Sequence, residues 1–193
     1  MAEDDGDITA SAAAEADSAL TPDEVMRSAH KKLDAALADE LLQRIRSGSS
    51  GFFESLVVRL LVAMGYGGSV TDVDKALVGG PGDGGIDGVI DQDPLGLDRI
   101  YVQAKCYADG NSVGASAIRD FFGSLDMKKA SKGIFVTSSS FSPSAKQTVE
   151  LLGKRIVLID GQQLARLMIR HDVGCRIEET LTIKKVDEEF FET

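Results

Sequence analysis

The chain has 193 residues, of which 43% are hydrophobic, enough for one domain with its own core plus tails. It has no run of 18 or more apolar residues and no basic segment leading into an apolar one at its N-terminus, so we expect no membrane span, no signal peptide and a cytoplasmic location. Its two cysteines, Cys106 and Cys175, form no CxxC pair, which argues against a zinc site and a disulfide.

The formal net charge of −10 is concentrated in the two ends of the sequence. Residues 1–26 carry eight acidic residues and no Lys or Arg, and residues 178–193 carry six acidic residues against Lys184 and Lys185. The remaining 17 acidic and 19 basic residues leave residues 27–177 with a net charge of +2. A nearly neutral centre neither predicts nor excludes DNA binding, and it indicates weak binding without a metal ion, a second copy or another domain.

The N-terminal region is expected to contain a tail and one long helix. Residues 1–20 are rich in Ala, Asp, Glu and Ser and predict a disordered acidic tail. The Thr-Pro-Asp-Glu at 21–24 is typical of a helix start, with Thr as the N-cap, Pro at the first helical position and Glu three residues after the cap. Apolar residues then recur at helical spacing, which predicts an amphipathic helix over 22–46 within an N-terminal segment 21–48.

The rest of the chain alternates between helical and β-strand patterns. A second helix is predicted over about 51–64, with an apolar face formed by Phe52, Leu56, Leu60 and Met64. Strands are predicted at 86–90, 99–105, 133–137 and 155–159, and helices at about 113–127, 142–152 and 161–171, the last with Asp160 as its N-cap. A final strand over about 174–186 would close the edge of the sheet. This order predicts a three-layer α/β/α fold with a central mixed β-sheet.

A glycine-rich segment, Gly79–Gly88, leads directly into the first predicted strand. Phosphate-binding loops lie between a strand and a helix, and the nucleotide type ends in Gly-Lys-Ser/Thr, which is missing here. We therefore reject that interpretation. The glycines are instead expected to let backbone or substrate come close to Asp87, although Asp-Gly pairs also occur in ordinary turns.

The second predicted strand ends in Gln103 and Lys105, which lie on the same face because they are two residues apart. A short hairpin would bring that face level with Asp87, so that a carboxylate, an amide oxygen and an ammonium group converge. Gln-x-Lys alone occurs by chance in many proteins. The prediction therefore depends on its combination with Asp87.

This combination suits the hydrolysis of phosphodiester bonds. The reaction needs a nucleophilic water and relief of charge on the phosphate oxygens, and Mg²⁺, with Mn²⁺ as a substitute, binds oxygen ligands and supplies that relief. Asp87 and either the Gln103 side-chain oxygen or the Ala104 carbonyl are the expected ligands. Lys105 would orient or deprotonate the water and stabilise the developing charge.

The segments around these residues resemble the catalytic domain of the Mrr family of restriction endonucleases, in the PD-(D/E)xK nuclease superfamily. In that family Gln replaces the usual acidic residue of the last motif, as in Gln103-Ala104-Lys105. The similarity covers about residues 50–176. It includes Phe53-Glu54, Met64-Gly65-Tyr66, Gly84–Gly88, Asp93–Asp98, Tyr101–Lys105, Phe121-Phe122-Gly123, Gly133–Ser138, Val157–Gly161 and Leu167-Met168-Ile169.

The resemblance implies a restriction-endonuclease-like fold and a Mg²⁺-dependent endodeoxyribonuclease that acts on modified DNA. Asp87 is implied as the metal-binding aspartate, Gln103 as the residue in the acidic-ligand position and Lys105 as the catalytic lysine. Glu54 matches the helical glutamate that can support the metal site or its water, although a helix residue of this kind is as often an ordinary surface group. Cys106 stands where the family usually has a basic residue, which puts one phosphate contact in doubt.

The resemblance also implies how the chain is divided and what it contacts. The nuclease domain is expected over 49–186, followed by an acidic tail at 187–193. Independently of the resemblance, Thr137, Ser138 and Ser139 follow the third predicted strand at the same sheet edge, where they would contact DNA phosphates or cap the next helix. Because Mrr-type enzymes generally carry a separate DNA-reading domain, DNA reading is expected from a partner or a homodimer. The alternatives are a non-catalytic DNA-binding or assembly module and a structure-specific junction nuclease.

Overall fold

The computed structural model describes residues 20–67, 76–77 and 85–192, and it is built around a four-stranded sheet. The predicted tail, apart from its last residue, and residues 79–84 of the glycine-rich segment lie outside these residues. The strands are β1 (Gly88–Asp91), β2 (Arg99–Lys105), β4 (Lys132–Thr137) and β6 (Arg155–Ile159), and they lie side by side in that order. A separate two-stranded sheet joins β3 (Ser112–Val113) to β5 (Ser140–Phe141).

The main sheet is mixed, as the alternating pattern predicts. β1 and β2 form an antiparallel hairpin in which Gly88 pairs with Val102, whereas β2, β4 and β6 are parallel, with Lys105 opposite Thr137. The carboxyl ends of β2, β4 and β6 therefore meet at one edge of the sheet. Because β1 runs the opposite way, its first residues lie at that same edge.

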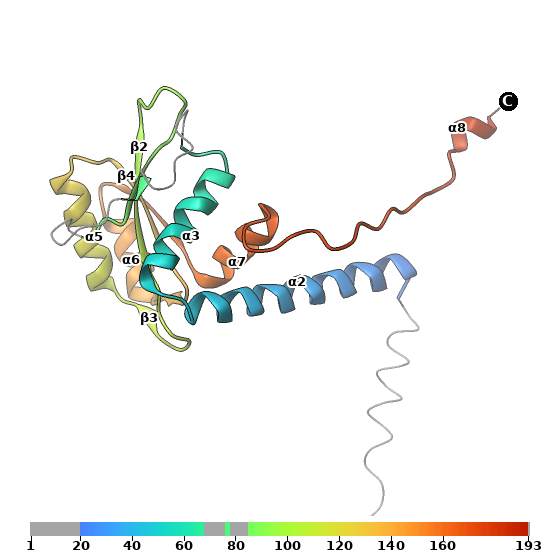
Figure 1. Cartoon of the computed structure of the whole chain (residues 1–193), viewed down its shortest axis with the longest axis horizontal. Helices are drawn as coiled ribbons and strands as arrows, with labels where there is room; N and C mark the ends of the chain where they lie inside the picture. The colour runs from blue at the N-terminus through green and yellow to red at the C-terminus, as the bar shows by residue number, and fades with distance from the viewer. Residues whose placement is uncertain (1–19, 68–75, 78–84, 193) are drawn as a thin grey trace, which may run out of the picture.

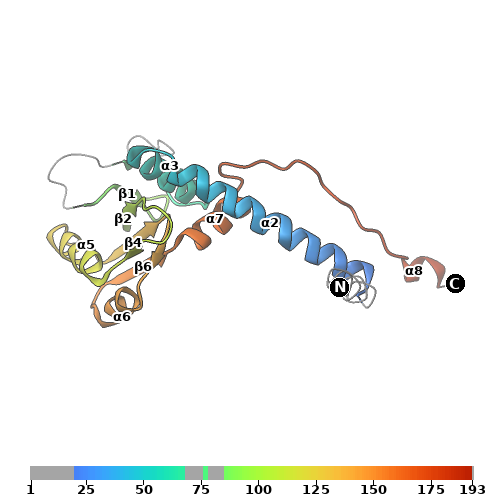
Figure 2. The ribbon, with the colours of Figure 1, turned by 90° about the horizontal axis from the view of Figure 1, so that it is seen from below.

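Helices cover both faces of the sheet and complete three layers (Figure 2). One face packs against α3 (Ser50–Ala63), α7 (Gly161–Arg170) and the end of α2 (Pro22–Arg46). The other face packs against α5 (Ala115–Met127) and α6 (Pro143–Leu151), with Phe121 and Phe135 in edge-to-face contact. The predicted three-layer fold is confirmed. No helix in the described segments has the length and apolar character needed to cross a membrane.

Local sequence signals place the helix starts where they were predicted. Thr21 and Glu24 form a capping box at the start of α2, and Asp160 and Gln163 form another at the start of α7. The buried side chains of α2 all belong to its second half: Ala38, Leu41, Leu42 and Ile45. The first half therefore projects away from the domain (Figure 1).

Two expectations from the sequence are wrong. Residues 174–186 form no strand, since Ile177, Leu181 and Ile183 are exposed and the segment runs outward to the short α8 (Glu188–Phe191) (Figure 1). On α3 the buried aromatic residue is Phe53, which is fully inaccessible, whereas Phe52 is 51% exposed. The helix is rotated so that Val57 and Leu61 also face the sheet, because α3 is hydrophobic around most of its circumference.

Gly133 provides a test of this packing, because it lies under two side chains of α5. A Cβ at this position would lie 2.7 Å from Phe121 Cζ and 2.9 Å from Leu125 Cδ1, and both side chains are fully buried. We expect Gly133→Ala to lower the free energy of unfolding by about 1–3 kcal/mol, the usual cost of overpacking a core. Urea unfolding followed by circular dichroism measures the change.

Gly123→Ala is the matched control, since a Cβ at Gly123 would meet no atom within 4 Å. Within α5 this substitution should be neutral or stabilising by up to about 1 kcal/mol, because alanine favours a helix over glycine. Equal effects of the two substitutions would contradict the packing described for Gly133.

Candidate active site

Asp87 lies one residue before β1 and is anchored against β2 by two hydrogen bonds. Its amide donates to the Val102 carbonyl at 2.9 Å, and its Oδ2 accepts from the Ala104 amide at 2.7 Å. Because β1 begins only at Gly88, the Ala104 amide has no β1 partner and takes a side-chain acceptor instead. Asp87 is thus fixed at the sheet edge where β2 ends.

Two charged side chains act on Asp87 from neighbouring elements. Burial raises the pKa of the Asp87 carboxyl group above its usual value of 3.8, and the Glu54 carboxylate raises it further, while the Ala104 hydrogen bond and the Lys105 charge lower it. Glu54 lies on α3, accepts from the Ser50 hydroxyl at 3.0 Å and is half-buried, as Lys105 is at the end of β2. The structure therefore brings Glu54 and Lys105 within electrostatic reach of Asp87.

Gln103 is buried, whereas Asp87, Glu54 and Lys105 are half-buried. It is only 6% exposed, and its Oε1 is fully buried with no hydrogen-bond partner among the described residues. Its amide group lies against Gly85, where a Cβ would come within 2.8 Å of Nε2 and where φ is +80°. Gly85 thus permits a close approach to Gln103, a role that the sequence assigned to Asp87. An unpaired buried acceptor is costly and calls for an explanation.

The donor atoms at this edge match the preferences of a hard divalent cation. Asp87 and Glu54 supply carboxylate oxygens and Gln103 supplies an amide oxygen without a partner, whereas the described residues hold no cluster of three His, Cys, Asp or Glu side chains. Mg²⁺ is usually bound by one or two carboxylates and keeps several waters, while zinc favours nitrogen and sulfur ligands. The residues present fit magnesium or manganese rather than zinc.

The burial of Thr137, Ser138 and Ser139 contradicts the prediction that they contact DNA. Thr137 and Ser138 are fully inaccessible and Ser139 is 9% exposed, so their hydroxyls do not face a nucleic acid. All three are bonded inside the protein: Thr137 Oγ1 donates to the Lys105 carbonyl, Ser138 Oγ to the Tyr107 carbonyl and Ser139 Oγ to the Asn111 carbonyl. The capping role belongs to Ser142, which accepts from the Ala145 amide at the start of α6.

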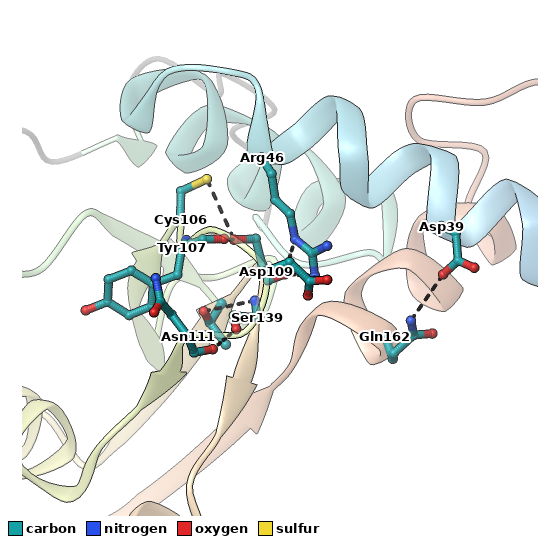
Figure 3. A network of polar contacts seen from close by, with 10 residues as sticks. Asp39, Arg46, Cys106, Tyr107, Asp109, Asn111, Ser139 and Gln162 are labelled. Carbon is teal, nitrogen blue, oxygen red and sulfur yellow. Dashed lines mark hydrogen bonds and ion pairs between the residues drawn. The ribbon is translucent and has the colours of Figure 1, made fainter.

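Arg46 was not identified from the sequence but reaches this part of the structure. Its guanidinium group, at the last residue of α2, donates to the Ser138 carbonyl and forms an ion pair with Asp109 in the loop after β2 (Figure 3). A basic residue in the last turn of a helix is ordinarily explained by the helix dipole. No sequence signal separates Arg46 from that common case.

Comparisons with known proteins find relatives among restriction endonucleases. A family described as "Restriction endonuclease", defined by the Mrr catalytic domain, matches residues 45–168. The type IV methyl-directed restriction enzyme EcoKMrr of Escherichia coli (strain K12) is 41% identical over 172 residues, which cover 89% of this chain and 55% of that enzyme. The chain thus spans about half the length of this curated relative.

Two solved structures share the fold at 26% sequence identity. One is the MspJI restriction endonuclease in complex with a 27-mer oligonucleotide, with a TM-score of 0.55 over 72% of this chain and 32% of that one. The other is the DNA modification-dependent restriction endonuclease AspBHI, with a TM-score of 0.53 over 74% of this chain and 36% of that one.

The raised pKa of Asp87 predicts how stability depends on pH. The folded chain holds the Asp87 proton more tightly than the unfolded chain, so stability is lost as the pH rises from below 3.8 through the raised pKa. Asp87→Asn cannot ionise but can still accept from the Ala104 amide. We expect its melting temperature to exceed that of the wild type at pH 7, with the difference shrinking as the pH falls towards 4.

Asp120→Asn, on the exposed surface of α5, is the control for the loss of one carboxylate. Its melting temperature should not exceed that of the wild type at pH 7. A lower melting temperature for Asp87→Asn than for the wild type at pH 7 would contradict the account of the Asp87 environment.

Proposed function

The chain belongs to the Mrr-type restriction endonuclease family, and from this we propose that it is a divalent-metal-dependent endonuclease that hydrolyses phosphodiester bonds in modified DNA. The observation that carries the proposal is that Glu54 and Lys105 lie within electrostatic reach of Asp87, together with a buried Gln103 oxygen that has no hydrogen-bond partner among the described residues. A module that only bound DNA would have no physical need for a partly desolvated carboxylate and a buried acceptor that pairs with no described residue.

Each residue has a distinct role in this proposal. Asp87 and the Gln103 side-chain oxygen, with the Ala104 carbonyl as a further ligand, would hold Mg²⁺ or Mn²⁺, and Glu54 would support the site or its water. Bound there, the cation would supply charge relief to the phosphate oxygens and lower the pKa of a bound water. The Lys105 ammonium group would orient the attacking water and stabilise the charge that develops on the phosphate.

The substrate class follows from the relatives. EcoKMrr is named as methyl-directed and AspBHI as modification-dependent, so we propose that this chain also acts on DNA that carries modified bases. The central region carries a net charge of only +2, which by itself supplies little attraction for DNA. DNA reading is therefore assigned to a separate partner or to a homodimer, which would also supply the two active sites that double-strand cleavage requires.

The proposed setting is the cytoplasm, where the DNA substrate is present. Cys106 and Cys175 are both free thiols, and the cysteines of cytosolic proteins are normally kept reduced.

Lys105→Ala tests the proposed activity directly. We expect the wild-type chain to nick plasmid DNA that carries methylated bases in the presence of Mg²⁺, and Lys105→Ala to be slower by at least about a hundredfold, a typical loss when a group acting on the water is removed. Gel electrophoresis of supercoiled plasmid measures the rate, and unmethylated plasmid tests the substrate class.

The control is Lys128→Ala, which removes the same charge at the opposite end of the sheet, since α5 ends at residue 127 before β4 begins. Lys128→Ala should cleave at the wild-type rate. Equal cleavage by the wild type and Lys105→Ala would refute the assignment of Lys105. If the wild type cleaved no DNA with either Mg²⁺ or Mn²⁺, a non-catalytic DNA-binding module would explain the chain better.

Metal binding can be tested without DNA. A ligand that binds only the folded state stabilises it by about 1.4 kcal/mol at ten times its dissociation constant. We expect Mg²⁺ or Mn²⁺ to raise the melting temperature of the wild type but not that of Asp87→Asn or Gln103→Leu. A metal-dependent increase of the same size in all three proteins would place the cation elsewhere.

A further inference from the structure

The loop that follows β2 starts beside Lys105 and is held by the end of β4. The Lys105 carbonyl accepts two hydrogen bonds, from Thr137 Oγ1 at 2.8 Å and from the Ser138 amide at 3.3 Å. The Ser138 hydroxyl accepts from the Tyr107 amide at 2.8 Å and donates to the Tyr107 carbonyl at 2.9 Å. The main chain on both sides of Cys106 is therefore fixed to the turn at the end of β4, which is formed by Thr137 and Ser138.

Arg46 joins this turn to a third element. From the end of α2, its Nε and Nη2 donate to the Ser138 carbonyl at 3.2 and 3.1 Å, and Nη2 also lies 3.1 Å from Asp109 Oδ1 in the loop after β2 (Figure 3). A guanidinium group presents several donors in one rigid plane, so it can hold the carbonyl and the carboxylate together. A lysine at this position would offer a single point of attachment.

The Ser138 peptide is also packed against α7. Gly161, the first residue of α7, lies so close that a Cβ there would come within 2.6 Å of the Ser138 carbonyl oxygen. The Gly161 amide also donates to the Ser139 carbonyl at 2.8 Å. Helices α2 and α7 thus enclose the turn that holds the Lys105 main chain.

We propose that Arg46 is a positioning residue for Lys105, acting through Ser138 and the loop 106–111. This inference rests on the proposed function, in which the Lys105 ammonium group must meet the water and the phosphate. Lys105 is the last residue of β2, so no strand pairing holds the main chain directly after it. The contacts of Arg46 restrain that main chain, from whose end the Lys105 side chain extends, and an error of about 1 Å in the position of a catalytic group can lower a rate by about a hundredfold.

A purely stabilising role accounts poorly for these contacts. Asp109 is 84% exposed, and an exposed ion pair contributes little to stability because solvent screens it. Arg46 itself is only 22% exposed, so its charge has lost much of its hydration. What the arrangement provides is a fixed geometry at the Ser138 carbonyl.

The experiment compares Arg46→Ala, Arg46→Lys and Ser138→Ala with Arg44→Ala, in the full chain. Arg44 is two residues earlier on the same helix and pairs only with Glu40 among the described residues, so its replacement removes the same charge without touching the loop. Two quantities are measured: kcat and KM for cleavage of methylated plasmid with Mg²⁺, and hydrogen exchange of the amides at 105–112.

We expect Arg46→Ala and Ser138→Ala to lower kcat by about tenfold to a hundredfold with KM within about twofold of the wild-type value. Exchange of the Tyr107 amide should become faster in both, Arg46→Lys should recover part of kcat, and Arg44→Ala should match the wild type. If Arg46→Ala does not fold, Arg46→Lys and Ser138→Ala decide the outcome alone.

Two results would overturn the proposal: an unchanged kcat despite faster exchange, or a change confined to KM, which would make Arg46 a DNA contact. Failure of the proposed function is distinguishable, because the wild type would then not cleave at all. The exchange measurement would still report whether Arg46 holds the loop.

Discussion

The hydrogen bond from the Ala104 amide to the Asp87 carboxylate determines where the charged groups of the site lie. It forms because β1 starts at Gly88, opposite Val102. The Ala104 amide of β2 therefore has no partner in β1 and donates to the Asp87 carboxylate instead. This anchors Asp87 at the end of the sheet, where burial and Glu54 disfavour its charge. In the proposed function, the positive charge of a bound cation would offset the cost that burial and Glu54 impose on the Asp87 carboxylate.

The end of β4 serves the same site from inside the protein. Three consecutive hydroxyl residues there are buried, and each satisfies a main-chain carbonyl in the segment from Lys105 to Asn111. A loop that leaves a strand would otherwise need water to satisfy those carbonyls. The loop beside Lys105 is consequently ordered by protein groups, which suits a site where a side chain has to keep its direction.

Local signals predicted most of this architecture, and long-range packing explains what they missed. The helix starts at Thr21 and Asp160 and the β-branched runs of β4 and β6 depend on neighbouring residues and were predicted correctly. Lys105 lies within electrostatic reach of Asp87 because β1 and β2 form the expected hairpin. The burial of Thr137–Ser139 could not be predicted, because it depends on carbonyls about 30 residues away. The segment 174–186 has strand-like composition, but it leaves the domain and pairs with no described strand.

The order of the elements along the chain has a consequence for synthesis on the ribosome. The hairpin and the two later parallel strands are added to the sheet one after another, each beside the strand before it. The apolar side of α2 is different, because Ala38 and Leu42 pack against Ala165 of α7, and Leu41 and Ile45 belong to the same core as Leu164 and Met168. This side of α2 therefore stays uncovered until α7 has emerged, a period in which chaperones have most to protect.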